Sequence, residues 1–448
     1  MDDVPRAAPE GAPDGAGPRR AGAGPRPHRR TPRRCGRRRA RAGRGAARGE
    51  GPPGGVRLGQ RGAAHPRRPT RRVSAPGVAV RRAAIDALVR IDRDDAYANL
   101  VLPSVLDGAE LDERDRHLVT ELVYGSTRRR RSLDWLYAPF VHRELDPEVR
   151  AALRVGTYQL HLTDVPDHAA VSATVGAVGG RVRGFVNAVL RKVAAVDVTW
   201  PDDATRLSYP DWILDRLRGD LGEEDALASL EAMNEPAVTH RREDGYVQDL
   251  ASQWVVELCD AQPGERVADL CAAPGGKSTG LARSGATVVA GDLRPSRVAL
   301  VAANAERTGA AGVHALVADA AAPPFPDQTF DRVLVDAPCT GLGVLRRRAD
   351  ARWRGGPEDV ERLAELQRRI VDAAVPLVRP GGLLVYSVCT LTAAETLGVD
   401  AHLAAAWPQL EPLPAPPEPW RPWGRGGLLL PQAAGADGMM ILRLRRPA

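Results

Sequence analysis

The chain has 448 residues, 43% of them hydrophobic, which is enough for two or three domains with a substantial core. It has no run of 18 apolar residues, no charged segment followed by an apolar stretch near the N-terminus, and no CxxC pair among its five cysteines. These features argue against a membrane span, a secretory signal and a clustered metal site, so we expect a cytoplasmic protein with free thiols. The net charge is +7, but residues 1–77 hold 20 arginines against 5 acidic residues, so the rest of the chain is mildly acidic.

Residues 1–77 form a tail of Arg, Gly, Pro and Ala with few aliphatic residues. This composition cannot bury enough apolar surface to offset the entropy of ordering, so it predicts a disordered segment. Three interpretations stay open for it: an RNA-binding arm without sequence preference, an over-extended reading frame, and a solvated tail.

Residues 78–200 predict a compact all-helical domain, because apolar residues recur at spacings of three and four in segments 78–91, 114–128, 147–162 and 183–196. The basic run Arg128–Arg131 is a candidate phosphate contact, and the alternative is a helical scaffold with arginines on its exposed faces. Residues 201–246 add helices around 212–222 and 224–234 and form a helical linker region.

Strands and helices alternate in residues 247–448. An amphipathic helix over 247–260 is followed by apolar runs that predict strands at 265–271, 286–292, 313–319, 330–338, 381–389 and 438–446. Helices are expected from Ser278, over 295–308 and over 357–378. Repeated strand–helix units with nearly continuous apolar strands are typical of a parallel, doubly wound α/β sheet.

The ends of the first three strands carry a candidate cofactor site. Strand one ends in a turn of small residues through which a backbone can approach a ligand closely: Cys271, Ala272, Ala273, Pro274, Gly275, Gly276 and Lys277. The turn matches neither GxGxxG nor the P-loop pattern, which disfavours a dinucleotide. Asp292 and Asp319 close the next two strands, where one acid suits a ribose diol and the other an adenine amino group, and Arg297 follows Asp292. This combination is typical of S-adenosylmethionine sites, although either acid alone would also suit a helix cap.

Cys339 and Cys389 each close an apolar strand, so both thiols are expected at the carboxyl edge of the sheet, where such folds bind ligands. Cytosine C5 is a poor nucleophile toward a methyl sulfonium, and a thiolate that adds to C6 makes C5 enamine-like. Asp336, three residues before Cys339, is placed to supply the acid needed at N3 of the base. The pattern therefore predicts covalent catalysis on a pyrimidine.

The motifs DLCAAPGGKST, VDAPCTGLG and YSVCT, in this order, strongly resemble those of the RNA 5-methylcytosine methyltransferases of the NOL1/NOP2/Sun family. The helical segments ending in GFVNAVLRKV resemble a NusB-like RNA-binding domain, as found in the bacterial 16S rRNA (RsmB-like) branch. The resemblance covers about residues 78–448. It implies an α/β fold with a Rossmann-like doubly wound methyltransferase sheet in 247–448, preceded by an all-helical NusB-like domain in 78–200. It also implies S-adenosylmethionine as the cofactor and RNA, specifically 16S rRNA, as the partner of a monomer that binds no membrane.

The resemblance further implies roles for single residues. It makes Cys389 the nucleophile, Cys339 the group that assists product release, and Asp336 a contact of the flipped cytosine. It assigns the turn from Cys271 to Lys277 to the cofactor, together with Asp292, Arg297, Asp319 and Asp336. Lys277 belongs to both sets, since it would hold the substrate or lower the pKa of Cys389. It is one of only two lysines in an arginine-rich chain, and arginine differs from lysine in shape and pKa behaviour.

After Cys339, five arginines surround Trp353, a pattern that suits phosphate contact and base stacking or a merely solvated loop: Arg346, Arg347, Arg348, Arg352 and Arg354. Two other functions stay open. One is a tRNA cytosine-C5 methyltransferase with the same chemistry, and the other is a non-catalytic NusB-like RNA-binding factor. The presence of both cysteines, Asp336 and Lys277 argues against the second.

Overall fold

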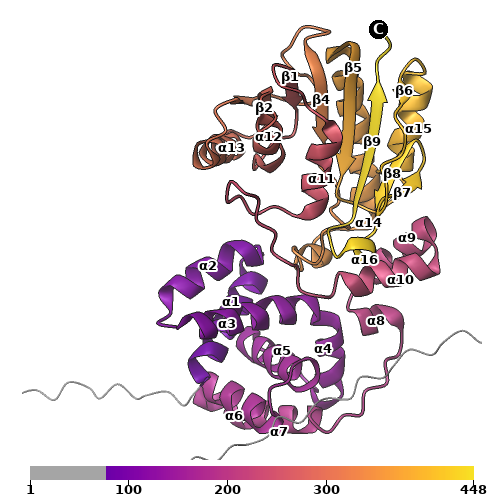
Figure 1. Cartoon of the computed structure of the whole chain (residues 1–448). Coiled ribbons are helices and arrows are strands. Elements are labelled where there is room, and N and C mark those ends of the chain that lie inside the picture. The colour runs from indigo at the N-terminus through magenta and orange to yellow at the C-terminus, as the bar shows by residue number, and fades with distance from the viewer. Residues whose placement is uncertain (1–76) are drawn as a thin grey trace, which may run out of the picture. The chain divides into compact units, whose positions relative to one another are not determined.

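The computed structural model describes residues 77–448, so the predicted disorder of residues 1–76 lies outside the described residues. Residues 78–193 are helical as predicted, with α1, α3, α5 and α7 at the four periodic segments and α2, α4 and α6 between them. They share one hydrophobic cluster that includes the fully buried Ile85, Leu122 and Leu153. Asp112 caps α3 by accepting a hydrogen bond from the backbone N–H of Asp115. Figure 1 shows these helices: α1 (Val78–Arg93), α2 (Ala98–Gly108), α3 (Glu113–Arg128), α4 (Arg130–Tyr137), α5 (Pro147–Leu162), α6 (Asp167–Ala177) and α7 (Gly180–Val193).

Three short helices follow in the region expected to form a helical linker: α8 (Asp203–Leu207), α9 (Asp211–Leu221) and α10 (Glu223–Ala232). These helices do not form an extended connection between two separate hydrophobic cores. The fully buried side chains of Tyr209, Ile213 and Leu230 belong to the same hydrophobic cluster as Phe330 and Tyr386 of the sheet. These helices therefore extend the core of the region that carries the site.

A nine-stranded sheet dominates the C-terminal part of the chain, in the order β3-β2-β1-β4-β5-β9-β8-β7, with β6 paired to β9. Strands β1 to β5 are mutually parallel, as predicted, whereas β9 runs antiparallel to β5. The late strand was thus predicted in place, but the sheet is mixed and has three additional strands of two to four residues that were not predicted. The strands are β1 (Arg266–Asp269), β2 (Thr287–Asp292), β3 (Val313–Val317), β4 (Phe330–Asp336), β5 (Val378–Val388), β6 (Glu411–Pro412), β7 (Arg421–Trp423), β8 (Gly426–Leu429) and β9 (Met439–Arg445).

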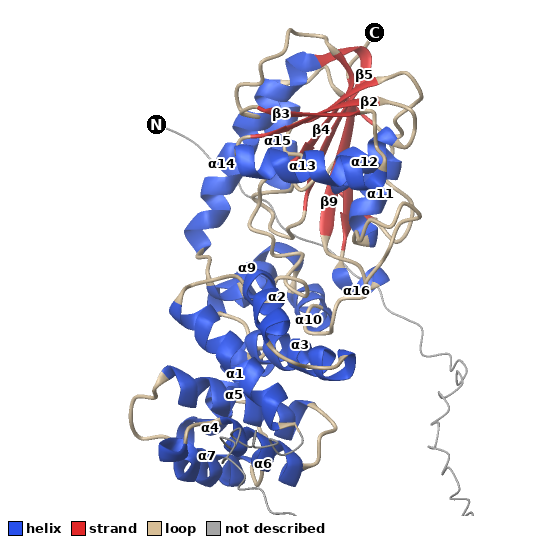
Figure 2. Ribbon diagram, turned by 90° about the vertical axis from the view of Figure 1, so that its left-hand side faces the viewer, coloured by secondary structure: helices blue, strands red, loops and turns tan. Residues whose placement is uncertain are grey.

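Both faces of the sheet are covered, which explains why its central strands read as continuous apolar runs. Successive residues of β4 alternate between two clusters: Val333 and Val335 pack with α14, and Leu334 packs with α11 and α12 on the opposite face. Figure 2 shows the helices around the sheet. They are α11 (Leu250–Cys259), α12 (Gly276–Ala282), α13 (Pro295–Thr308), α14 (Pro357–Ala374), α15 (Leu397–Ala406) and α16 (Pro431–Ala434). The Rossmann-like fold class, preceded by an all-helical region, is confirmed.

The structure corrects the expectation that Arg128–Arg131 contact phosphate. Arg128 is buried and donates to the carbonyl of Arg346 (3.2 Å), and Arg129 donates to the carbonyl of Arg206 (2.8 Å). Arg131 pairs with Asp211 (2.8 Å). This run fastens the helical domain to the chain that follows it, and it is not a basic surface.

The arginine-rich segment after Cys339 is mostly internal as well. Arg352 is fully buried, and its guanidinium donates to carbonyls of Arg128, Ser208 and Leu345 and to the Asn234 side chain. The remaining members are held in the same way: Arg346 by the carbonyl of Gly435, Arg347 by Asp249 and Asp437, Arg354 by the carbonyls of Asp95 and Ala96, and the Trp353 indole by the carbonyl of Thr127. Their predicted role in RNA contact is therefore wrong, and only Arg348 of this segment is exposed.

Candidate active site

The predicted site lies where the strand order reverses. Strand β1 leads to β2 on one side of the sheet, and β4 pairs with β1 on the other side and continues to β5. Open α/β sheets bind ligands at such a switch point, outside the carboxyl ends of the strands. The turn after β1, the end of β4 with the following residues to Cys339, and Cys389 after β5 therefore lie at the same edge of the sheet.

The two cysteines lie side by side, with their Sγ atoms 3.3 Å apart, although they are 50 residues apart in the chain. Both thiols are half-buried, so one side of the pair is accessible. This confirms the expectation that the two strand ends bring the thiols together.

The two thiols are electrostatically unequal. A hydrogen bond from Cys339 lowers the pKa of Cys389 against the effect of burial, and the charges of Lys277 and Arg348 lower it further. The same hydrogen bond, together with burial and the negative charge of Glu395, raises the pKa of Cys339 well above its usual range. The positive charges near Cys389 and the negative charge near Cys339 thus favour a Cys389 thiolate that accepts a hydrogen bond from a Cys339 thiol.

Lys277 and Asp336 form an ion pair beside the thiols. The Lys277 Nζ donates to Asp336 Oδ2 (2.7 Å), and the Ser387 hydroxyl donates to Asp336 Oδ1 (2.8 Å). Burial by itself would lower the pKa of Lys277, but the Asp336 carboxylate outweighs it and raises that pKa. The amine is therefore a fixed positive charge next to Cys389, and the Asp336 carboxylate is oriented by two donors.

The expected cofactor turn is braced by neighbouring elements. The backbone N–H of Ala272 donates to the carbonyl of Gly291 (2.8 Å) at the end of β2. Arg297 donates to both the Asp292 carboxylate (3.0 Å) and the carbonyl of Ala273 (3.0 Å), so the predicted acid and arginine hold the turn together.

Gly275 is the one residue of the turn whose backbone demands glycine. Its φ is +101°, and an added Cβ would lie 3.1 Å from the Cα of Val301. Asp319 differs from the other candidates. It is exposed after β3, and its carboxylate accepts a hydrogen bond from the backbone N–H of Ala321 in a local turn, where no helix begins.

Sequence reasoning missed Asp269, which closes β1. Asp269 is fully buried, its Oδ2 accepts from the Ser278 hydroxyl (2.7 Å), and its Oδ1 has no hydrogen-bond partner within residues 77–448. Burial raises the pKa of this carboxyl to about 7. An acid inside an otherwise apolar strand was the available signal, because a buried carboxylate without a partner is costly unless a ligand supplies one.

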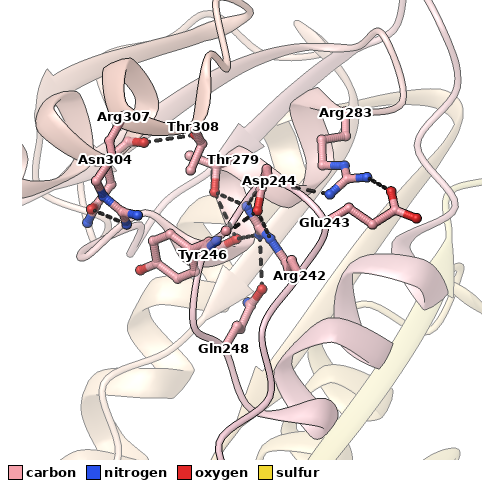
Figure 3. Close-up of polar contacts among 12 residues, drawn as sticks. Arg242, Glu243, Asp244, Tyr246, Gln248, Thr279, Arg283, Asn304, Arg307 and Thr308 are labelled. Atoms are coloured by element: carbon pink, nitrogen blue, oxygen red, sulfur yellow. Dashed lines mark hydrogen bonds and ion pairs between the residues drawn. The ribbon is translucent and has the colours of Figure 1, made fainter.

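A polar cluster beneath the turn was also missed, and Figure 3 shows it. The buried Arg242 donates to the carbonyl of Gly276 (2.6 Å), to the Thr279 hydroxyl (2.9 Å) and to Gln248 (3.0 Å). The Tyr246 ring lies 4.8 Å from the Arg242 guanidinium and would lie 3.0 Å from a Cβ on Gly276. The loop that contains these residues therefore fixes the start of α12, and nothing in its local sequence pattern indicated this.

Comparison with known proteins agrees with this architecture. Residues 256–445 match the model of the family described as 16S rRNA methyltransferase RsmB/F, and residues 78–195 match the model of the NusB family. No helix within residues 77–448 is both long and apolar enough to cross a membrane.

Two curated relatives match over nearly their full lengths. The chain is 39% identical to the ribosomal RNA small subunit methyltransferase B of Thermus thermophilus, over 82% of this chain and 97% of that protein. It is 34% identical to the probable ribosomal RNA small subunit methyltransferase B of Bacillus subtilis, over 82% of this chain and 98% of that protein. The solved structure of PH0851 shares the fold, with a TM-score of 0.70 at 23% identity over 84% of this chain and all of that chain. The chain therefore belongs to the RsmB/F family of 16S rRNA methyltransferases.

Proposed function

We propose that this protein is an S-adenosylmethionine-dependent RNA cytosine-C5 methyltransferase that acts on 16S rRNA through a covalent bond between Cys389 and C6 of the base. The observation that carries the proposal is the thiol pair, with Cys339 and Cys389 3.3 Å apart beside the ion pair of Lys277 and Asp336. Cytosine C5 needs activation by a nucleophile that adds to C6 before it can accept a methyl group, whereas a nitrogen or oxygen acceptor needs no such thiol.

The chemistry follows from the inequality of the thiols. The Cys389 thiolate, favoured by the Cys339 hydrogen bond and by Lys277, adds to C6, and the electron pair of the C5–C6 bond makes C5 nucleophilic. Asp336 holds the polar edge of the cytosine, since two donors fix its carboxylate. After methylation, a base accepts the C5 proton, and the electron pair of the C5–H bond restores the C5–C6 double bond as the bond from C6 to the Cys389 sulfur breaks and Cys389 leaves as a thiolate. Cys339 assists this release.

The residues around the turn suit the proposed cofactor. S-adenosylmethionine, when bound, supplies an electrophilic methyl group on a sulfonium. Asp269 Oδ1, a buried acceptor without a partner within residues 77–448, suits the ammonium of the same molecule. The small residues of the turn from Cys271 to Lys277 let the protein backbone approach a ligand closely. Asp292 is buried at the end of β2, the place in such a sheet from which an acid would contact the ribose of the cofactor.

RNA is the proposed partner because the NusB family model matches residues 78–195 and the relatives are named ribosomal RNA methyltransferases. Arg348 is exposed, and its charge lowers the pKa of Cys389, so it lies where a phosphate of a bound strand would pass.

A comparison of cysteine variants tests the proposal. The full chain is incubated with labelled S-adenosylmethionine and total RNA, and products are separated on a denaturing gel. We expect wild-type label in 16S rRNA, no protein–RNA adduct with Cys389→Ala, and an accumulated adduct with Cys339→Ala. Cys259→Ala is the control, because Cys259 is buried in α11 outside the site.

Each other outcome is informative. The reverse adduct pattern would exchange the roles of the two cysteines. Label in tRNA alone would identify tRNA as the substrate. A folded wild-type protein that binds RNA but incorporates no label would refute the proposed methyltransferase activity. Bisulfite sequencing of RNA from a strain that lacks the gene would then identify the position.

A further inference from the structure

Each site cysteine is followed by a threonine, and the two threonines meet below the thiols. The hydroxyls of Thr340 and Thr390 lie 2.8 Å apart. Both donate to one oxygen of Glu395, Thr340 at 2.6 Å and Thr390 at 3.1 Å. The loops that carry Cys339 and Cys389 therefore share one acceptor.

Glu395 is fully buried, and the donors that residues 77–448 direct at its side chain are all neutral. Besides the two threonine hydroxyls, they are the backbone N–H of Thr340 (2.9 Å), the Thr392 hydroxyl (2.8 Å) and the Gln367 amide (3.0 Å). Burying a carboxyl group is costly even when it is hydrogen-bonded, and packing alone would be served by an apolar residue. A buried acid with five donors is thus a polar network that specifies one geometry.

The network holds the Cys339 loop on both sides of the cysteine. The Gln367 amide that donates to Glu395 also donates to the carbonyl of Pro338 (2.9 Å), just before Cys339. The Tyr386 hydroxyl donates to Gln367 (3.0 Å) and to the backbone carbonyl of Glu395 (2.7 Å). Helix α14 and both cysteine loops are therefore tied to the Glu395 side chain, and strand β5 is tied to Gln367 and to the Glu395 backbone.

We propose that Glu395 is a positioning residue that clamps the Cys339 and Cys389 loops through Thr340 and Thr390, so that both sulfur atoms face the same base. The inference rests on the proposed function, in which one thiol bonds to the pyrimidine and the other assists release. Both steps need the two sulfurs at fixed places, and a misplacement of 1 Å can cost about 100-fold in rate. The Glu395 charge also acts on Cys339 and helps to keep that thiol protonated.

The test measures the thiol pair itself and needs neither RNA nor cofactor. Dibromobimane, a bifunctional reagent, becomes fluorescent when both of its ends react with thiols, so its second reaction reports how the two sulfurs are placed. In a background in which Cys35, Cys259 and Cys271 are replaced by alanine, we expect Glu395→Ala to slow the second reaction about tenfold relative to the first. Glu395→Gln keeps the shape and the acceptor for the Thr340 N–H, so we expect it to restore most of the rate.

Thr390→Val and Thr392→Val form a matched pair within the same network. Each removes one hydroxyl from Glu395, but only Thr390 follows a cysteine. We expect Thr390→Val to slow the second reaction several-fold and Thr392→Val to leave it near the wild-type rate. Thr390→Val should add little when Glu395 is already Ala.

If the second reaction is as fast in Thr390→Val as in wild type, the proposed clamp is overturned. This result does not depend on whether Glu395→Ala folds. Equal slowing by both threonine variants would also overturn the clamp, since it would indicate a general loss of packing. A wild-type protein that cross-links as expected but transfers no methyl group would instead refute the proposed function and leave the clamp intact.

Discussion

Replacing Lys277 by Met tests the ion pair at the centre of the site. The substitution removes the ammonium 2.7 Å from Asp336 and leaves the carboxylate with Ser387 as its remaining hydrogen-bond donor. Removing one partner of a fully buried pair costs about 3–5 kcal/mol. The Asp336 side chain is 28% exposed, so water takes up part of that cost, and we expect a loss of about 2–3 kcal/mol in the free energy of unfolding.

Lys192 supplies a matched control, because it is the other lysine of the chain and lies exposed on α7. Lys192→Met should change the free energy of unfolding by less than about 0.5 kcal/mol. Urea unfolding followed by circular dichroism measures both variants. The Lys277→Met, Asp336→Asn double-mutant cycle then isolates the pair, with an expected coupling of about 1–3 kcal/mol.

The same substitution also reaches the thiols. Because the Lys277 charge lowers the pKa of Cys389, its removal should move the pH profile of Cys389 alkylation to higher pH, with no such move in Lys192→Met. The reasoning is refuted if Lys277→Met is as stable as Lys192→Met and the cycle shows no coupling.

Three further substitutions have expected outcomes. Gly275→Ala should lower the free energy of unfolding by about 3 kcal/mol and weaken cofactor binding in calorimetry, because its φ is +101° and the new Cβ would meet Val301. Gly309→Ala, at φ +68° with no atom near the new Cβ, should lower it by about 1–2 kcal/mol. Equal losses in the two variants would contradict the close approach of Gly275 to Val301. Asp269→Asn should flatten the pH dependence of stability. The pKa of Asp269 is raised to about 7, so its contribution is fully present below about pH 4 and is lost as pH rises from about 4 through 7. In urea titrations the variant should gain up to about 4 kcal/mol on wild type between pH 4 and pH 8, and parallel profiles would count against the buried acid. Arg352→Met leaves four oxygen acceptors without their donor and should cost about 3–5 kcal/mol in the same assay, while a loss below about 1 kcal/mol would place this arginine at the surface.

Much of the fold was predictable because its signals are local. The predicted helix at 295–308 and the strands around β1, β2, β4 and β5 follow from apolar periodicity and from turn residues near their ends. The antiparallel direction of β9 was not predictable, because an apolar run does not determine whether its strand is parallel or antiparallel to the neighbouring strand. The strands β6 to β8 are only two to four residues long, too short for a periodic signal, and β6 and β8 pair with β9 while β7 pairs with β8.

The arginines show the limit most clearly. By composition, Arg128–Arg131 and the arginines after Cys339 look like a basic surface, and the structure uses most of them as internal donors to backbone carbonyls. Arginine can do either, because its apolar stem packs in a core while its planar head satisfies several acceptors. Whether the head meets a carbonyl or a phosphate depends on segments more than 200 residues apart in the chain, as with Arg352 and Arg128.

By itself, the sequence determined the chemistry available to this protein: a small-residue turn, two strand-end thiols, an acid three residues before one of them and a rare lysine. Its alternating pattern also determined that these groups would share one edge of a sheet, because parallel strands end together. Only the tertiary structure decided how they act on one another. It placed the sulfurs 3.3 Å apart, gave Lys277 to Asp336, and set Glu395 beneath both cysteine loops. Such contacts join distant segments through burial and hydrogen-bond geometry, and neither is written in local spacing.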